Sequence, residues 1–195
     1  MASTEQPQEP QGFLHGKLLI AMPGMPDPRF GKSVIFMCQH SDQGAMGLIV
    51  NKPIDLTFGQ LMTKMDIPVA PRAPGRPVLF GGPVDTDRGY ILHSNERTNL
   101  PPSTIAVTPD ISMTLTVDLL KQIASGHGPD RWLMALGYAG WGPGQIESEI
   151  VSNGWIHCEP DSAIIFGTDM EAKWSQAFAK LGAGLSGLSS QTGRA

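Results

Sequence analysis

The sequence predicts an α+β fold built around a large mixed β-sheet. Short apolar runs bounded by glycine, proline or polar residues outnumber segments with helical spacing, and the early runs are joined by short turns, as in hairpins. The chain holds 23 glycines and 17 prolines among 195 residues, a share that predicts many turns and short strands. No internal repeat is present, so we expect one domain rather than an array.

The two ends of the chain differ in composition from the middle. Residues 1–12 are polar, carry prolines and have no hydrophobic period, which predicts a disordered tail. Residues 182–195 are rich in glycine and serine, which predicts a flexible tail. We therefore expect a single folded domain over residues 13–181.

The expected strands are short apolar runs. The first hairpin pairs two of them around a polar turn at residues 41–44. The strand after residue 131 is the most apolar and is expected to be central. The predicted strands cover residues 17–22, 33–40, 46–50, 78–80, 88–93, 104–107, 132–136, 155–158 and 163–166.

Three helices are predicted beside the one that follows the central strand. Thr57 is placed to cap a short helix that begins at Phe58. Thr116 is placed to cap a second helix, with Val117 on the inward face. Thr168 or Asp169 caps a last amphipathic helix.

Charge and cysteine content exclude several classes of protein. The net charge is −4 and no stretch gathers Lys or Arg, which disfavours direct nucleic-acid binding, since that binding relies on several cations on one face. Two cysteines do not form a disulfide framework in a chain of this length. The N-terminus lacks the layout of a signal peptide, and no apolar run approaches eighteen residues. A cytoplasmic protein that does not act at a membrane is expected.

Residues 137–150, G-Y-A-G-W-G-P-G-Q-I-E-S-E-I, hold the most distinctive pattern, which predicts a strand, a glycine-rich loop and a helix. Gly140, Gly142 and Gly144 can expose N–H groups to an anion, with a helix start at Gln145. Trp141 and its neighbour Tyr138 could stack on a planar ligand. The same glycines also suit a corner where other segments press on bare backbone. The second interpretation is favoured, and the first stays open.

Glu147 and Glu149 lie in the first turn of that predicted helix, where carboxylates interact favourably with the helix dipole. A catalytic role would require a partner acid, base or metal ion, and none is indicated nearby. We therefore predict no catalytic residue.

A metal site is not predicted either. On one strand Cys38 and His40 should point to the same face, whereas His157 and Cys158 should point to opposite faces. At most three of them could then converge, and a closed structural zinc site requires four. No metal and no cofactor is expected.

Two further turns follow apolar runs, Asn51-Lys52 before Pro53 and Gly81-Gly82 before Pro83. Three turns of this kind predict one shared end of the sheet, where a ligand site could assemble. The candidate ligand-binding residues are Gly140, Trp141, Gly142, Gly144, Gln145, Glu147, Asn51, Lys52, Gly81 and Gly82.

Several motifs together resemble those of the AlgH/YqgE-like family of bacterial proteins. They are G-Y-A-G-W-G-P-G-Q followed by Glu147, G-M-P-D-P-R-F at 24–30, G-A-M-G-L-I-V-N-K-P at 44–53 and F-G-G-P-V at 80–84. The resemblance covers residues 12–181. It implies a compact domain with a bifurcated mixed sheet, partly barrel-like, surrounded by helices. The family carries the label of transcriptional regulator, from a link to the control of alginate production, and has no established biochemical activity.

Three functions compete at this point. We favour a non-enzymatic regulatory or adaptor protein that acts through a small anionic ligand or a protein contact, because glycine corners and aromatic residues occur without a catalytic constellation. The alternatives are a DNA-binding transcriptional regulator, as the family label implies, and an enzyme that acts on a nucleotide- or phosphate-bearing substrate.

Overall fold

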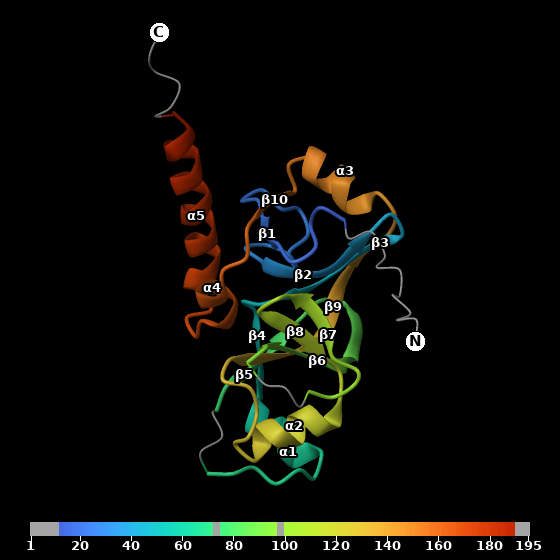
Figure 1. The fold of residues 1–195 in the computed structure, drawn as a ribbon. Coiled ribbons are helices and arrows are strands. Elements are labelled where there is room, and N and C mark those ends of the chain that lie inside the picture. Colours follow the sequence, from blue (N-terminus) through green and yellow to red (C-terminus); the bar gives the residue numbers. More distant parts are fainter. Residues whose placement is uncertain (1–11, 72–74, 97–99, 190–195) are drawn as a thin grey trace, which may run out of the picture.

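The computed structural model describes residues 12–71, 75–96 and 100–189 (Figure 1). Within these ranges the chain forms one ten-stranded sheet and five helices, which confirms the α+β prediction. The predicted N-terminal tail lies almost entirely outside the described residues. Of the predicted C-terminal tail, residues 190–195 lie outside them, and residues 182–189 form the end of the last helix. None of the helices in the described ranges is long and apolar enough to span a membrane.

The strands form an open, branched sheet in the order β10-β1-β2-β3-β9-β6-β8-β7, with β5 joined to β9 and β4 joined to β5. All pairs are antiparallel except β5 with β9. The sequence missed β4 and β8. The strands are β1 (Leu18–Ala21), β2 (Val34–Ser41), β3 (Gly44–Ile49), β4 (Pro53–Thr57), β5 (Pro77–Phe80), β6 (Val84–Ser94), β7 (Ile105–Thr108), β8 (Ile111–Thr114), β9 (Trp132–Trp141) and β10 (Trp155–Cys158).

The branch point is on β9. Ala135 pairs with β6 on one edge and with β5 on the other, whereas residues 139–141 pair with β3 on that second edge. Strands β3 and β5 thus share one edge of β9 and diverge from it. We call this divergence the fork. Because β3 supplies ladder partners, residues 137–141 continue β9 instead of forming the predicted loop, and only residues 142–144 form a turn.

The helices cover the sheet in three groups (Figure 1). At one end of the molecule lie α1 (Phe58–Lys64) and α2 (Val117–Ala124), and α3 (Gln145–Val151) lies at the other. Along one side run α4 (Ser162–Phe166) and α5 (Ala172–Ser189). Each group closes its own cluster of buried apolar side chains against the sheet.

Local capping decided several helix starts. Thr57 forms a capping box with Gln60 and begins α1 as predicted. Thr116 precedes α2, but its side chain makes no capping bond there. The inward placement of Val117 was wrong, since it is 46% exposed. The buried side chains of α2 start at Leu119.

The strand predicted at residues 163–166 was also wrong, since this run is the helix α4. Asp161 Oδ1 accepts hydrogen bonds from the N–H groups of Ala163 (2.9 Å) and Ile164 (3.3 Å), which caps the helix. A short apolar run fits a buried strand and a buried helical turn equally well, and here the cap decides. Asp169 Oδ1 accepts from the N–H of Ala172 (3.1 Å) at the start of α5, as expected.

Candidate ligand-binding site

Gly81 and Gly82 lie at the fork. The N–H of Gly81 donates to the carbonyl of Leu136 (2.8 Å), and its carbonyl accepts from the N–H of Ile49 (2.9 Å). A Cβ at Gly82 would lie closer than 3.0 Å to the backbone of Tyr138. These glycines therefore let three backbone segments pack directly on one another.

Asn51 and Lys52 lie at the same fork. Asn51 Oδ1 accepts from the N–H of Val34 (2.9 Å), and its Nδ2 donates to the carbonyl of Lys32 (2.8 Å). The Lys52 carbonyl accepts from the N–H of Phe80 (2.8 Å), and burial lowers the pKa of the Lys52 ammonium. The structure thus brings two of the three predicted turns together and fills their junction with backbone hydrogen bonds.

The remaining turn is held closed by a carboxylate. Glu149 Oε2 accepts from the indole N–H groups of Trp141 (3.0 Å) and Trp155 (2.8 Å), and Oε1 accepts from Gln145 Nε2 (2.8 Å). The Gln145 side chain in turn accepts from the N–H of Gly142 (3.0 Å). We call this group the Glu149 clasp. The clasp occupies the Gly142 N–H, which the sequence predicted as a possible donor to a bound anion. Gly144 has a left-handed φ of 68°, and α3 begins at the next residue.

Glu147 has a partner that the sequence did not indicate. Its Oε1 lies 2.8 Å from His40 Nε2, and the N–H of Leu14 donates to His40 Nδ1 (3.2 Å). Because Nδ1 accepts, Nε2 carries the proton and donates to the carboxylate. The pKa of Glu147 is lowered, mainly by its own backbone N–H and then by His40. The His40 side chain is only 3% exposed, so the pair anchors the segment around Leu14.

The expectation that Cys38 and His40 share one face was wrong. The β2–β3 register shifts between Met37 and Gln39, so one extra residue is accommodated and the alternation of faces is broken. Cys38 remains in the core that α5 covers, whereas His40 turns towards α3. Burial raises the pKa of the Cys38 thiol to about 12. In the described ranges, no three His, Cys, Asp or Glu side chains gather closely enough to hold a metal ion.

Lys173 of α5 is a buried cation that the sequence analysis overlooked. Its Nζ donates to the carbonyls of Val50 (2.7 Å) and Ile165 (2.8 Å). Burial, with a smaller contribution from the nearby Arg76, lowers the pKa of Lys173 to about 8. Lys173 thus ties α5 to the chain just before the fork.

An open site lies on the other side of β9, where β6 is irregular. Val84 pairs with Tyr138 and Gly89 pairs with Leu136. Between these two pairs β6 advances by five residues and β9 by only two. We call residues 85–88 the β6 bulge. All four are exposed, and Asp85 has a left-handed φ of 48°. Bulges direct side chains out of a ladder and occur often beside functional sites.

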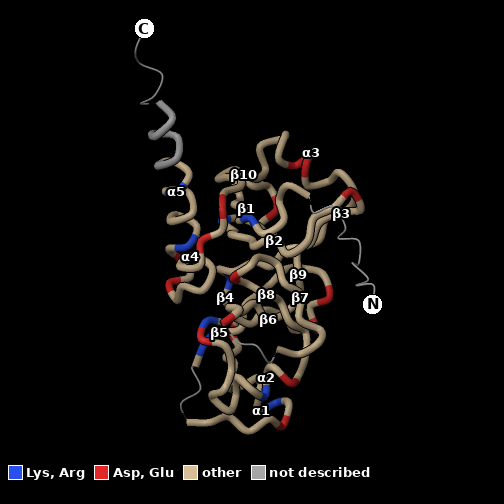
Figure 2. The backbone as a smooth tube through the Cα atoms, in the orientation of Figure 1, with Lys and Arg blue, Asp and Glu red and all other residues tan. Residues whose placement is uncertain are grey.

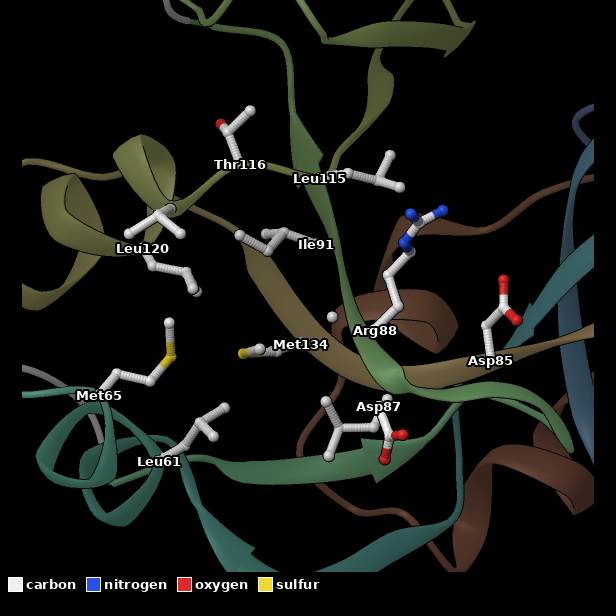
Figure 3. Close-up of a pocket in the computed structure, with 13 residues that line it drawn as sticks. Leu61, Met65, Asp85, Asp87, Arg88, Ile91, Leu115, Thr116, Leu120 and Met134 are labelled. Carbon is white, nitrogen blue, oxygen red and sulfur yellow. The ribbon is translucent and has the colours of Figure 1, made fainter.

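On one face of β6 and β9 the bulge borders a cleft of about 560 Å³ between α1 and α2 (Figure 3). Apolar side chains from both helices and both strands form most of its wall, and Met65 and Val117 remain 38% and 46% exposed within it. The charged side chains Asp85, Asp87 and Arg88 lie together at one end. We call this hollow the α1–α2 cleft.

On the opposite face the bulge borders a second hollow, of about 590 Å³, between the β2–β3 hairpin and β8. Asp85, Arg88 and Leu115 line both hollows. Of the ten predicted site residues, Gly140 and Trp141 line this second hollow and the other eight line neither. We call it the hairpin hollow.

The sequence contained a signal for the bulge. Asp85-Thr86-Asp87-Arg88 places three charges in four residues of a chain that is only 16% charged. The run lies just before the apolar residues 90–92 of the same strand. A charged run at the start of an apolar strand indicates a bulge or a site.

The comparisons with known proteins agree with the fold. Residues 18–186 match the model of the AlgH-like family, DUF179. A UPF0301 protein from Jannaschia sp. is 49% identical to this chain, over 93% of this chain and 95% of the relative. A UPF0301 protein from Rhodopseudomonas palustris is 47% identical, over 97% of this chain and 90% of the relative.

Two solved structures are also similar. The solution structure of the AlgH protein from Pseudomonas aeruginosa has a TM-score of 0.75 and 38% identity, over 97% of this chain and all of that one. A Corynebacterium diphtheriae protein shares the fold alone, with a TM-score of 0.69, 17% identity, and coverage of 90% of this chain and 89% of that one. Sequence and structure agree: the chain belongs to the AlgH-like family.

Proposed function

We propose that this chain is a cytoplasmic, non-enzymatic regulatory protein that binds a small ligand in the α1–α2 cleft. The observation that carries the proposal is an apolar cleft of about 560 Å³ with charged groups at one end only. Small-molecule sites have this size and this pattern, in which apolar walls supply affinity and a few polar groups fix orientation. The ligand has an apolar body and a polar head.

The exposed side chains support this use of the cleft. Of the five large apolar side chains exposed in the described ranges, Met65 and Val117 line the α1–α2 cleft. An apolar side chain left in water beside a concave apolar wall favours a ligand that covers it.

The charged groups at the mouth suit binding rather than proton transfer. The Arg88 guanidinium offers N–H donors and no acceptor, so it can hold an anionic or carbonyl group of a ligand. Asp85 and Asp87 are exposed carboxylates on the same bulge. Together with Arg88, these carboxylates favour a ligand whose polar head both donates and accepts hydrogen bonds.

The distribution of charge favours a small ligand over a nucleic acid. In Figure 2 the Lys and Arg positions are spread along the molecule from α5 to α1 and alternate with Asp and Glu. The cleft itself has two carboxylates and one guanidinium at its mouth. Phosphate backbones are bound by clustered cations, so the α1–α2 cleft does not suit them.

A thermal-shift screen with amphipathic metabolites tests the proposal. A ligand present at about 100 times its Kd should stabilise the protein by about 2.7 kcal/mol, which raises the Tm by about 5 to 10 °C for a chain of this length. Val117→Gln should remove this shift because the cleft wall becomes polar. Val151→Gln is the matched control, since Val151 is 82% exposed and does not line the cleft.

Two results would contradict the proposal. One is a screen in which no compound raises the Tm. The other is a set of hits that respond equally to Val117→Gln and Val151→Gln. The regulatory part is tested by affinity capture from cell extract with and without the best ligand, where a partner whose recovery changes with ligand is expected.

A further inference from the structure

The hairpin hollow has a floor that is built from three strands. Gln39 of β2 pairs with Met46 of β3, and Met46 pairs with Gly140 of β9. All three residues line the hollow. Along this row Gln39 has a polar side chain, Met46 has a flexible apolar one and Gly140 has none, so the floor of the hollow is flat.

Gly140 differs from the glycines at the fork. A Cβ at Gly140 would meet the side chains of Tyr138 (3.1 Å) and Val84 (3.8 Å), both of which line the hollow. At Gly82, by contrast, a Cβ would meet backbone closer than 3.0 Å. The missing side chain at Gly140 therefore keeps the hollow open, and a Cβ there would press on side chains instead of backbone.

Two irregularities in the ladders direct polar groups to this hollow. The extra residue at the β2 register shift places Gln39 on its floor, and the β6 bulge places Arg88 at one end. Burial raises the pKa of the Tyr90 phenol, and the nearby Arg88 side chain lowers it in part. In the described ranges Arg88 has no carboxylate within ion-pair distance. Its guanidinium thus remains available to a carboxylate that enters the hollow.

The wall is aromatic. The rings of Tyr90 and Tyr138 lie edge to face, with centroids 5.7 Å apart. Tyr90 is 3% exposed and serves as wall, whereas Tyr138 is only half-buried and leaves part of its ring in the hollow. A further planar ring can stack on this surface.

We infer that the hairpin hollow is a second binding site, for a planar aromatic compound that carries one carboxylate. The ring lies over Gly140 and Met46 beside Tyr138, and the carboxylate pairs with Arg88. Asp85 lines the same end, so a head with several negative charges, such as a triphosphate, is disfavoured. This site lies on the opposite face of β6 and β9 from the α1–α2 cleft, and the two sites share Asp85, Arg88 and Leu115.

NMR titration of the full chain labelled with ¹⁵N tests the inference, with indole-3-acetate as the probe and indole-3-acetamide as its neutral counterpart. We expect indole-3-acetate to shift the amide signals of Gly140 and its neighbours with a Kd of about 1 mM or tighter. Gly140→Val should weaken binding at least about tenfold because it fills the space above the floor. Gly24→Val is the matched control, since a Cβ at Gly24 meets nothing within 4 Å.

Arg88→Gln should reduce the affinity for indole-3-acetate to that for indole-3-acetamide. Val117→Gln should leave both affinities unchanged, which separates this site from the α1–α2 cleft. If Gly140→Val fails to fold, Tyr138→Leu replaces it, and weaker binding is expected for the lost ring contact. Equal affinity of the two probes, no effect of the hollow variants, or no binding up to about 10 mM would overturn the inference.

Discussion

The fork and the β6 bulge both lie against β9, yet one is filled with backbone and the other is open. At the fork, Gly82 packs on the backbone of Tyr138, and β3 and β5 are joined through Gly81. At the bulge, β6 leaves the ladder, and its charged side chains extend between two hollows. Gly81 and Gly82 thus build the branch of the sheet, whereas the charged residues of the β6 bulge border both candidate sites.

The largest effect is expected at the fork. Gly82→Ala should prevent folding or cost more than about 4 kcal/mol, because the new Cβ meets backbone atoms that cannot move aside. Circular dichroism and urea unfolding measure the loss. Gly59→Ala is the control: a Cβ there meets nothing within 4 Å, and alanine in α1 should stabilise by about 0.5 to 1 kcal/mol. A stable Gly82→Ala protein would show that the fork tolerates a side chain.

The next effect is expected at the Glu149 clasp. Glu149→Ala leaves the indole N–H groups of Trp141 and Trp155 without their acceptor, so we expect a loss of about 3 kcal/mol in the free energy of unfolding. Glu149→Gln keeps one acceptor oxygen and should lose less. If the two variants lose the same amount, the carboxylate is not what closes this turn.

Lys173 should make stability depend on pH. Its folded pKa of about 8 lies below the ordinary lysine value of 10.5. Between these two values the unfolded chain binds the proton more tightly, so the free energy of unfolding rises with pH. The gain should be about 2 kcal/mol between about pH 7 and about pH 9.5. The raised pKa of Cys38 acts in the opposite sense above about pH 9.

The comparison with Lys173→Met isolates this effect, since every other titrating group is common to both proteins. Urea unfolding of each protein across the pH range gives the difference in slope. Parallel curves would mean that Lys173 keeps an ordinary pKa in the folded protein.

The smallest effect is expected at the bulge. Asp85→Gly removes a side chain from a residue with a left-handed φ of 48°, and the relief of strain roughly offsets the greater freedom of glycine in the unfolded chain. The free energy of unfolding should therefore change by less than about 0.5 kcal/mol. A loss as large as that of Glu149→Ala would show that the bulge is part of the packed structure and not an open site.

Local signals in the sequence predicted much of the fold. Thr57 and Asp169 mark helix starts through bonds that span three residues, and the β2–β3 hairpin follows from two apolar runs and a polar turn. The error at residues 163–166 was also local, since Asp161 was available as a cap and the apolar run was assigned to a strand. β8 was missed because its burial comes from pairing with β6 and β7.

The sequence by itself determined the family, the α+β class and the positions of the glycine-rich segments, because apolar period, turn residues and caps act over a few positions. Only the tertiary structure decided how those places are used. Glu147 meets His40 across 107 positions, and the register of β6 on β9 sets the bulge. Pairings over such separations depend on the whole packed sheet. Two glycines that follow apolar runs therefore have different surroundings: Gly82 packs against backbone, and Gly140 lines an open hollow.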